Sequence, residues 1–469
     1  MNLPLFLIVA INLLKLGLIR FFPLIGDEAY YWLWGQHLAF SYVDHPPMIA
    51  YLNRVLATLF GNSELAVRLA ALTIVALVTY IIYLTAKELF GKQTALWSAL
   101  FFNLIPTFFG GGMFLVPQML VFFFWSLSCY LLIRLIKSGD GKYWYYLGIS
   151  IGLGLLSDYV MALFIFATFM YLIVDQEKRF WFWRKEPYLG LCLSLGLFLP
   201  VIVWNFGLGF TPLFYWGGKM GAGPRIGDNL LNFFGLQTLL YTPPIFLGTI
   251  YLIFKQFWKP KTNREVYSQV FLMATFAGAV FLPFALISPI INVGGHWPAC
   301  AYLPAIVASG KMKRWTIVVL LIFALILDGA GLSYYLFAYP TPADLKGKEF
   351  SINAQLPAYI KETTPKSGKT YYFANDLGML GLVAFHGQVK VNMAPGRLKQ
   401  VDLWGTPRLN KGDNIIYFAI NEFELHQKLA PLFQKVWVEP KRRLFNKDAD
   451  LPRLTRIYHA EGYKGGLIP

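Results

Sequence analysis

Charged residues are scarce in this chain of 469 residues. Only 14% of the residues are charged, whereas 57% are hydrophobic. A soluble domain carries roughly 25% charged residues. A chain so poor in charge cannot cover its surface with polar groups, so lipid rather than water surrounds much of it. We therefore predict an integral membrane protein. The glycines and prolines are spread through the apolar runs, as is typical of membrane helices and not of disordered segments.

Acidic residues are few beside basic ones, and the formal net charge is +16. A basic excess is one mark of a nucleic-acid-binding protein. Here the basic residues lie mostly in short loops between apolar runs, a pattern that membrane topology produces by itself. We therefore expect membrane lipid, and no nucleic acid, among the partners.

Cysteine is almost absent, and a recognisable signal peptide is missing. Cys129, Cys192 and Cys300 each lie in a different apolar run without metal-ligand spacing, so we interpret them as buried small residues. The apolar N-terminus shows neither the basic first region nor the small-residue cleavage site of a signal peptide. It is predicted to be a retained first membrane span.

Long apolar runs dominate the first 338 residues. A bilayer core ~30 Å thick needs about 20 apolar residues per helix. On this basis the sequence predicts about eleven transmembrane helices, near residues 2–22, 67–86, 94–110, 113–136, 143–157, 159–175, 188–206, 232–254, 268–290, 297–310 and 315–338. The stretch 143–175 is either one re-entrant pair or two short helices.

Lysine and arginine are distributed unevenly between the two sets of loops. One set holds sixteen of them and the alternate set holds four, namely Arg54, Arg68, Lys219 and Arg225. Loops rich in Lys and Arg face the cytoplasm. The N-terminus is therefore predicted to lie inside the cell, and everything after residue 338 outside it.

The last part of the chain has ordinary charge density. Short alternating apolar pieces at 370–374, 388–393 and 414–420 indicate strands, and residues 422–434 have helical spacing. The sequence thus predicts two domains: a transmembrane domain over 1–339, which includes a long outer loop at 23–66, and a small extracytoplasmic α/β domain over 340–469.

The first outer loop carries two acids directly after the first span. Asp27 and Glu28 would lie at the depth of the membrane interface, where a carboxylate is partly desolvated unless it has a partner. Such groups suit general-base chemistry or metal binding. The alternative is structural: Asp27 would only cap a helix that starts at Glu28.

The same loop contains Asp44-His45-Pro46-Pro47. The two prolines end any helix and fix an extended turn, which holds the Asp and His side chains in one place. His45 could bind phosphate, and Asp44 with His45 could bind a divalent metal ion. The alternative is a turn that merely begins a helix, with proline at its first position.

Three further places on the outer side carry candidate residues. Loop 207–231 holds Lys219 and Arg225 among glycines and could close over a phosphate, or it is an ordinary solvated loop. His296 at an outer helix end is a second phosphate candidate, although Trp297 beside it suits an interfacial aromatic belt. Asp158, between two short spans, is either functional or a simple turn residue.

Several of these segments resemble the polytopic GT-C glycosyltransferases. The likeness is to the bacterial branch that is related to protein O-mannosyltransferases and to the enzymes that add aminoarabinose or galacturonic acid to lipid A. The motifs that carry it are Asp27-Glu28-Ala29-Tyr30-Tyr31-Trp32, the segment Tyr42–Ala50 around Asp44-His45-Pro46-Pro47, Gly61–Arg68, Pro200–Asn205, His296-Trp297-Pro298-Ala299 and Gly396–Trp404.

The resemblance implies an inverting sugar transfer from a polyprenyl phosphate donor taken from the outer leaflet. It places the acid of the first loop, Asp27, at the reaction centre with Glu28 beside it, and it places Asp44 and His45 near the donor phosphate or a divalent metal. The acceptor is an envelope lipid, a glycan or a protein. The remaining candidates bind the donor phosphate or the substrate: Tyr30, Arg54, Asp158, Lys219, Arg225 and His296.

Two positions depart from the family pattern. Relatives usually have an acid in the second outer loop, where this chain has Val116-Pro117-Gln118, and they often have a lysine where this chain has Asp158. Either the site is rebuilt, with Asp158 supplying the missing acid, or the chain has changed substrate or lost activity. Two alternatives therefore stay open: a transporter or flippase for a lipid-linked sugar, and an inactive relative that binds polyprenyl lipid.

Overall fold

The computed structural model describes residues 3–21, 24–210, 226–255, 264–333, 356–393, 400–405, 407–420, 422, 424–439 and 455–468. The chain divides into two compact units. The helical unit consists of residues 1–19, 40–48 and 68–332, and the α/β unit consists of residues 20–39, 49–67 and 333–469. The predicted boundary between residues 339 and 340 lies outside the described residues and stays a prediction.

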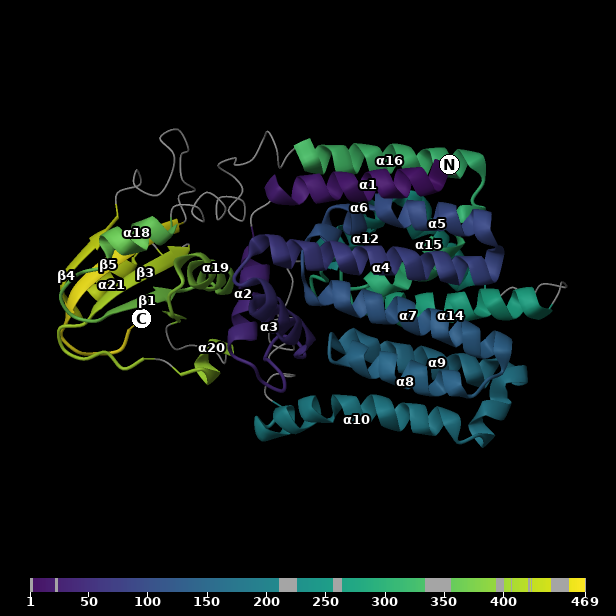
Figure 1. Cartoon of the computed structure of the whole chain (residues 1–469), viewed down its shortest axis with the longest axis horizontal. Coiled ribbons are helices and arrows are strands. Elements are labelled where there is room, and N and C mark those ends of the chain that lie inside the picture. Colours follow the sequence, from purple (N-terminus) through teal and green to yellow (C-terminus); the bar gives the residue numbers. More distant parts are fainter. Residues whose placement is uncertain are drawn as a thin grey trace. The chain divides into compact units, whose positions relative to one another are not determined.

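The helical unit is built from long apolar helices that run side by side (Figure 1). Its helices are α1 (Leu3–Leu18), α4 (Glu64–Phe90, apart from its first turn), α5 (Lys92–Leu104), α6 (Pro106–Phe109), α7 (Pro117–Ser138), α8 (Lys142–Leu155), α9 (Ala162–Val174), α10 (Glu186–Gly207), α12 (Ile226–Tyr241), α13 (Pro243–Lys255), α14 (Arg264–Ile287), α15 (Leu303–Ala308) and α16 (Arg314–Ser333). Among the described residues, five helices are long and apolar enough to cross a membrane, or up to eight if each bent pair forms one span. A membrane fold is consistent with this result, and the predicted total of about eleven spans stays a prediction.

Proline breaks several of the predicted spans. Helices α5 and α6 meet at 77° before Pro106, and α12 and α13 meet at 112° around Thr242, which has a φ of 65° and precedes Pro243. Proline lacks an N–H and excludes helical conformation from the residue before it. The predicted spans 94–110 and 232–254 are therefore each a bent pair of helices and not one continuous helix.

Two other predicted stretches are also clarified. The predicted span 297–310 consists of α15 and two flanking 3₁₀ helices, because Pro298 and Pro304 interrupt it. The stretch 143–175 forms two separate helices, α8 and α9, with a 3₁₀ helix at Tyr159–Met161 between them. Asp158 thus lies at the turn where one helix ends and the other begins.

The α/β unit contains a five-stranded sheet in the order β2-β1-β3-β5-β4. The strands are β1 (Thr370–Ala374), β2 (Val391–Asn392), β3 (Asn414–Ile420), β4 (Phe433–Val438) and β5 (Thr455–Tyr463). Strand β1 pairs in parallel with β2 and β3, and β5 pairs antiparallel with β3 and β4. The sequence predicted β1 and β3 at their observed bounds. The helix predicted at 422–434 is limited to α21 (Leu425–Leu429), because β4 begins at Phe433.

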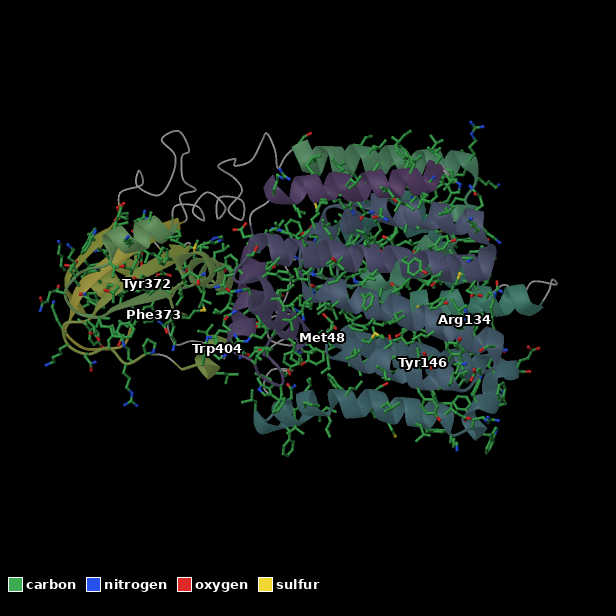
Figure 2. All side chains as sticks on the ribbon, viewed as in Figure 1. Met48, Arg134, Tyr146, Tyr372, Phe373 and Trp404 are labelled. Atoms are coloured by element: carbon green, nitrogen blue, oxygen red, sulfur yellow. The ribbon has the colours of Figure 1, made fainter. Side chains whose placement is uncertain are left out.

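Buried aromatic side chains hold the sheet together. Phe373 on β1, labelled with its neighbour Tyr372 in Figure 2, is fully buried and stacks on Tyr417 of β3 at 5.9 Å between ring centroids. Helix α18 (Leu356–Thr363) is fastened to β5 by the hydroxyl of Tyr359, which lies 2.7 Å from Nε2 of His459. These contacts explain why residues from distant parts of the sequence form one core.

Helices from the predicted first outer loop belong to this unit as well. They are α2 (Gly26–Gln36) and all but the first residue of α3 (Met48–Phe60). Helix α2 packs on α19 (Leu377–Gly387), where Trp32 meets Phe385 edge to face at 4.9 Å between ring centroids. Asn62 extends the contact, because it accepts a hydrogen bond from Nε1 of Trp32 (3.2 Å) and donates one to Gln388 (2.9 Å).

Gly381 permits the close approach of α19 to α2. A Cβ atom at this position would overlap the backbone nitrogen of Tyr30. We expect Gly381→Ala to lower the free energy of unfolding of the protein in detergent by about 1–3 kcal/mol, and with it the melting temperature. The backbone atoms of Tyr30 cannot move aside as a flexible side chain can. Gly329→Ala in α16 is the matched control, since a Cβ atom there meets no other atom within 4 Å. Equal melting temperatures for Gly381→Ala and the wild type would show that the two helices separate without cost.

Candidate active site

A cavity of about 240 Å³ lies within the helical unit. Its polar lining consists of Asp44, His45, Gln118, Asp158 and His296, together with Tyr159. Apolar side chains, among them Phe284 and Trp297, line the remainder. The structure thus brings together four of the residues that the sequence singled out, Asp44, His45, Asp158 and His296, although they come from three distant segments.

Backbone hydrogen bonds fix the segment that carries Asp44 and His45. The N–H of Tyr42 donates to the carbonyl of His45 at 3.2 Å, which closes the turn. The N–H of Met48, labelled in Figure 2, donates to the carbonyl of Leu156 at 2.9 Å, at the end of α8. Helix α3 begins at Met48 and not at a proline, so the prolines precede the helix. Asp44 is buried, as is Pro46.

His45 and Asp158 form a close pair in the cavity wall. Nδ1 of His45 lies 3.4 Å from Oδ2 of Asp158, and the two side chains are only 13% and 11% exposed. The second oxygen of Asp158, Oδ1, accepts a hydrogen bond from the N–H of Val160 at 2.9 Å. Asp158 is therefore a turn residue that caps the 3₁₀ helix Tyr159–Met161, and the same carboxylate also contacts His45.

Gln118 and Asp158 line the same cavity. Gln118 is the second residue of α7, directly after Pro117. Relatives in the family that the chain resembles usually have a carboxylate where Gln118 stands and often a lysine where Asp158 stands. The structure places both side chains at one cavity. A rebuilt site, in which Asp158 supplies the missing acid, stays a prediction.

Three neighbours of His296 escaped the sequence analysis. Gln237, Tyr241 and Tyr302 are buried behind the segment Gly294–Trp297, and Gln237 and Tyr241 hydrogen-bond the carbonyl of Gly295. All three lie within predicted spans, where a tyrosine is not a sign of a functional site. The uncharged but strongly polar Gln237 within an apolar run is the signal that could have identified the group.

The sequence predicted a metal site at Asp44 and His45. In the part of the chain that the structure describes, no three His, Cys, Asp or Glu side chains are grouped so that they could hold a metal ion. Asp44 and His45 still offer a carboxylate and an imidazole at the cavity. A divalent metal at these two residues remains a prediction.

The other candidates from the first loop lie in the α/β unit. Asp27 is the second residue of α2 and is exposed. The helix begins at Gly26 with Ile25 as its N-cap, so the structural alternative for Asp27, a cap on a helix starting at Glu28, is wrong. Glu28 is fully buried, and its carboxylate accepts a hydrogen bond from the N–H of Ile25 at 3.2 Å.

Tyr30 and Arg54 have different surroundings. Tyr30 is buried and meets Trp34 edge to face, with 5.2 Å between ring centroids. Arg54 is exposed, and its Nη1 donates to Oε1 of Gln36 at 3.4 Å. Lys219 and Arg225 lie outside the described residues. The roles assigned to all these candidates remain predictions.

Comparisons with known proteins found one matching family and one similar enzyme. Residues 44–204 match the family of dolichyl-phosphate-mannose-protein mannosyltransferases. The lipid A galacturonosyltransferase RgtD of Rhizobium johnstonii is 22% identical over 284 residues, which are 59% of this chain and 58% of RgtD. The chain therefore matches little more than half the length of this relative.

Two proteins of known structure have folds similar to that of this chain. ArnT from Cupriavidus metallidurans is 14% identical and covers 97% of both chains, with a TM-score of 0.70 in the apo state and 0.66 bound to undecaprenyl phosphate. The oligosaccharyltransferase of Archaeoglobus fulgidus, tethered to an acceptor peptide, is also 14% identical. It covers 83% of this chain and 64% of its own, with a TM-score of 0.53.

Proposed function

We propose that this chain, whose fold is similar to that of ArnT, is a GT-C glycosyltransferase that transfers a sugar from a polyprenyl (undecaprenyl) phosphate donor to an envelope acceptor. The acceptor is lipid A or lipopolysaccharide, a cell-wall glycan or a protein. One observation carries the proposal: an acid–imidazole cavity stands in a fold that ArnT, solved with undecaprenyl phosphate, shares. The proposal includes a location. The chain lies in a bacterial inner membrane, which it crosses about eleven times, and its C-terminal domain is extracytoplasmic.

Inverting transfer makes three demands on the protein. The acceptor oxygen attacks the anomeric carbon from the face opposite the phosphate, the bond from that carbon to the phosphate oxygen breaks, and the acceptor proton passes to a base. Polyprenyl phosphate then leaves with its negative charge. The protein must supply the base, stabilise the charge and keep water from hydrolysing the donor.

We assign the base to Asp27 and the phosphate to the cationic and imidazole groups. Asp27 is exposed at the start of a helix, where its carboxylate can meet an acceptor hydroxyl. The phosphate-binding set is His45, Arg54, Lys219, Arg225 and His296. Such preorganised donors stabilise developing charge by several kcal/mol in a site that excludes water.

Asp158 has a distinct part in this scheme. Its carboxylate lies 3.4 Å from Nδ1 of His45 and orients the imidazole ring in the cavity wall. The opposite ring nitrogen, Nε2, can then face the leaving phosphate. Gln118 cannot carry charge, so the acids in the lining of the cavity are Asp158 and Asp44.

A turnover assay tests the proposal directly. Purified protein in liposomes is incubated with radiolabelled undecaprenyl phosphate sugars and envelope extracts, and we expect the label to move to an acceptor as undecaprenyl phosphate is released. Movement of intact donor across the bilayer without consumption would identify a flippase. Donor binding with no turnover would identify an inactive relative. Mass analysis of envelope lipids with and without the gene would then identify the sugar and the acceptor.

A further inference from the structure

A buried polar cluster lies directly behind the segment Gly294–Trp297. It consists of Gln237 and Tyr241 on α12 and Tyr302 at the end of the 3₁₀ helix Ala299–Tyr302. All three side chains are 0% exposed. The rings of Tyr241 and Tyr302 stack at 3.7 Å between centroids, which makes the cluster rigid.

The hydrogen bonds of the cluster converge on one backbone carbonyl. Nε2 of Gln237 donates to the carbonyl of Gly295 at 3.1 Å, and the hydroxyl of Tyr241 donates to the same oxygen at 3.4 Å. The hydroxyl of Tyr302 donates to Oε1 of Gln237 at 2.8 Å and thereby orients the amide. Buried polar groups are costly unless they are bonded, so each member keeps the others in place.

The glycines of the segment allow this close fit. A Cβ atom at Gly295 would overlap the side chain of Leu240 on α12, and one at Gly294 would lie 2.6 Å from Nε1 of Trp297. The carbonyl of Gly295 belongs to the peptide group that it shares with His296. Fixing that carbonyl therefore fixes the backbone from which the His296 side chain projects to the cavity.

The same face of α12 holds the chain before this segment. Nδ2 of Asn229 donates to the carbonyl of Pro289 at 3.3 Å, and Nδ2 of Asn232 donates to Oδ1 of Asn292 at 2.7 Å. Amide side chains thus follow α12 at roughly one-turn intervals and bind successive parts of 289–295. A purely apolar contact would have held this stretch without specifying its orientation.

We propose that Gln237, Tyr241 and Tyr302 are positioning residues that hold His296 in the orientation that binds a phosphate oxygen of the lipid-linked donor. The proposal rests on the proposed function, because it takes polyprenyl phosphate as the ligand of the cavity. None of the three side chains is assigned a contact with the donor; they act through the backbone of Gly295.

A double-mutant cycle with undecaprenyl phosphate tests the proposal. The dissociation constant is measured by calorimetry on the full-length protein in detergent, for Gln237→Leu, for His296→Ala and for the double variant. We expect Gln237→Leu to weaken binding about tenfold in the wild-type background. We expect no further loss when Gln237→Leu is added to His296→Ala, because Gln237 acts on binding only through His296. Thr238→Val is the control: it removes a hydroxyl that donates only to Phe234 of its own helix.

Each outcome of the cycle decides the matter. Additive effects of Gln237→Leu and His296→Ala, with normal binding by the wild type, would overturn the positioning role and leave the proposed function standing. Failure of the wild type to bind undecaprenyl phosphate would overturn the donor class and the positioning role together. If Gln237→Leu does not fold, Tyr302→Phe takes its place, since it removes only the hydroxyl that orients Gln237, and a smaller loss that again vanishes without His296 is expected.

Discussion

Asp27→Asn is expected to lower the rate of sugar transfer by on the order of 10²–10⁴-fold, the contribution typical of a general base. The asparagine side chain has nearly the same shape but cannot take the proton of the acceptor hydroxyl. Since Asp27 is exposed and is not the cap of α2, the exchange should leave the protein folded. Transfer of radiolabel from an undecaprenyl phosphate sugar under single-turnover conditions measures the effect on chemistry alone.

The matched control for this variant is Asp228→Asn. Asp228 is also an exposed acid in the first turn of a helix, so its exchange costs the same favourable contact with the helix dipole, about 0.3–1 kcal/mol. We expect it to keep full activity. If Asp27→Asn transferred sugar at the wild-type rate, Asp27 would not be the base and the acid would have to be sought elsewhere.

Asp158→Asn is expected to lower kcat/KM by on the order of 10²-fold. The asparagine oxygen can still accept the hydrogen bond from Val160, so the 3₁₀ helix remains capped, but the negative charge that faces His45 is lost. His45→Ala should cost at least as much. The double variant should be little worse than His45→Ala alone, because residues that act as one unit give non-additive losses.

Asp175→Asn provides a close control for Asp158→Asn. Asp175 caps the 3₁₀ helix Gln176–Trp183 in the same way, with its carboxylate accepting from the N–H of Glu177 at 3.1 Å. It lies at the other end of α9 and does not line the cavity. Equal activity of the two variants would mean that Asp158 only shapes the turn. An inactive wild type, by contrast, would favour the interpretation that the chain binds lipid without turnover.

The sequence predicted local features better than it predicted spatial groups. Strands β1 and β3 were evident because runs of four and six consecutive apolar residues lie between polar segments. The bends at Ile105 and Thr242 were overlooked, because hydropathy continues across each break while the proline that causes it is one residue. Hydropathy predicts whether a segment lies in lipid or in water, but it does not predict where a helix bends.

The candidate site was predicted in part for the same reason. Asp44, His45, Asp158 and His296 are polar residues at the ends of apolar runs, so each could be singled out by itself, and the structure adds that they share one cavity. The pairing of His45 with Asp158 and the cluster around Gln237 depend on contacts between segments more than 50 residues apart. Local patterns carry no information about such contacts.

Strand β5 lies between β3 and β4, although among the described residues it is the strand that is synthesised last. The sheet therefore cannot be completed until Thr455–Tyr463 has been synthesised, and α2 is made long before α19, its packing partner. At 5–20 residues per second, the roughly 350 residues between them take on the order of 20–70 s to translate. Throughout that interval Trp32 lacks the cover that Phe385 of α19 will give it.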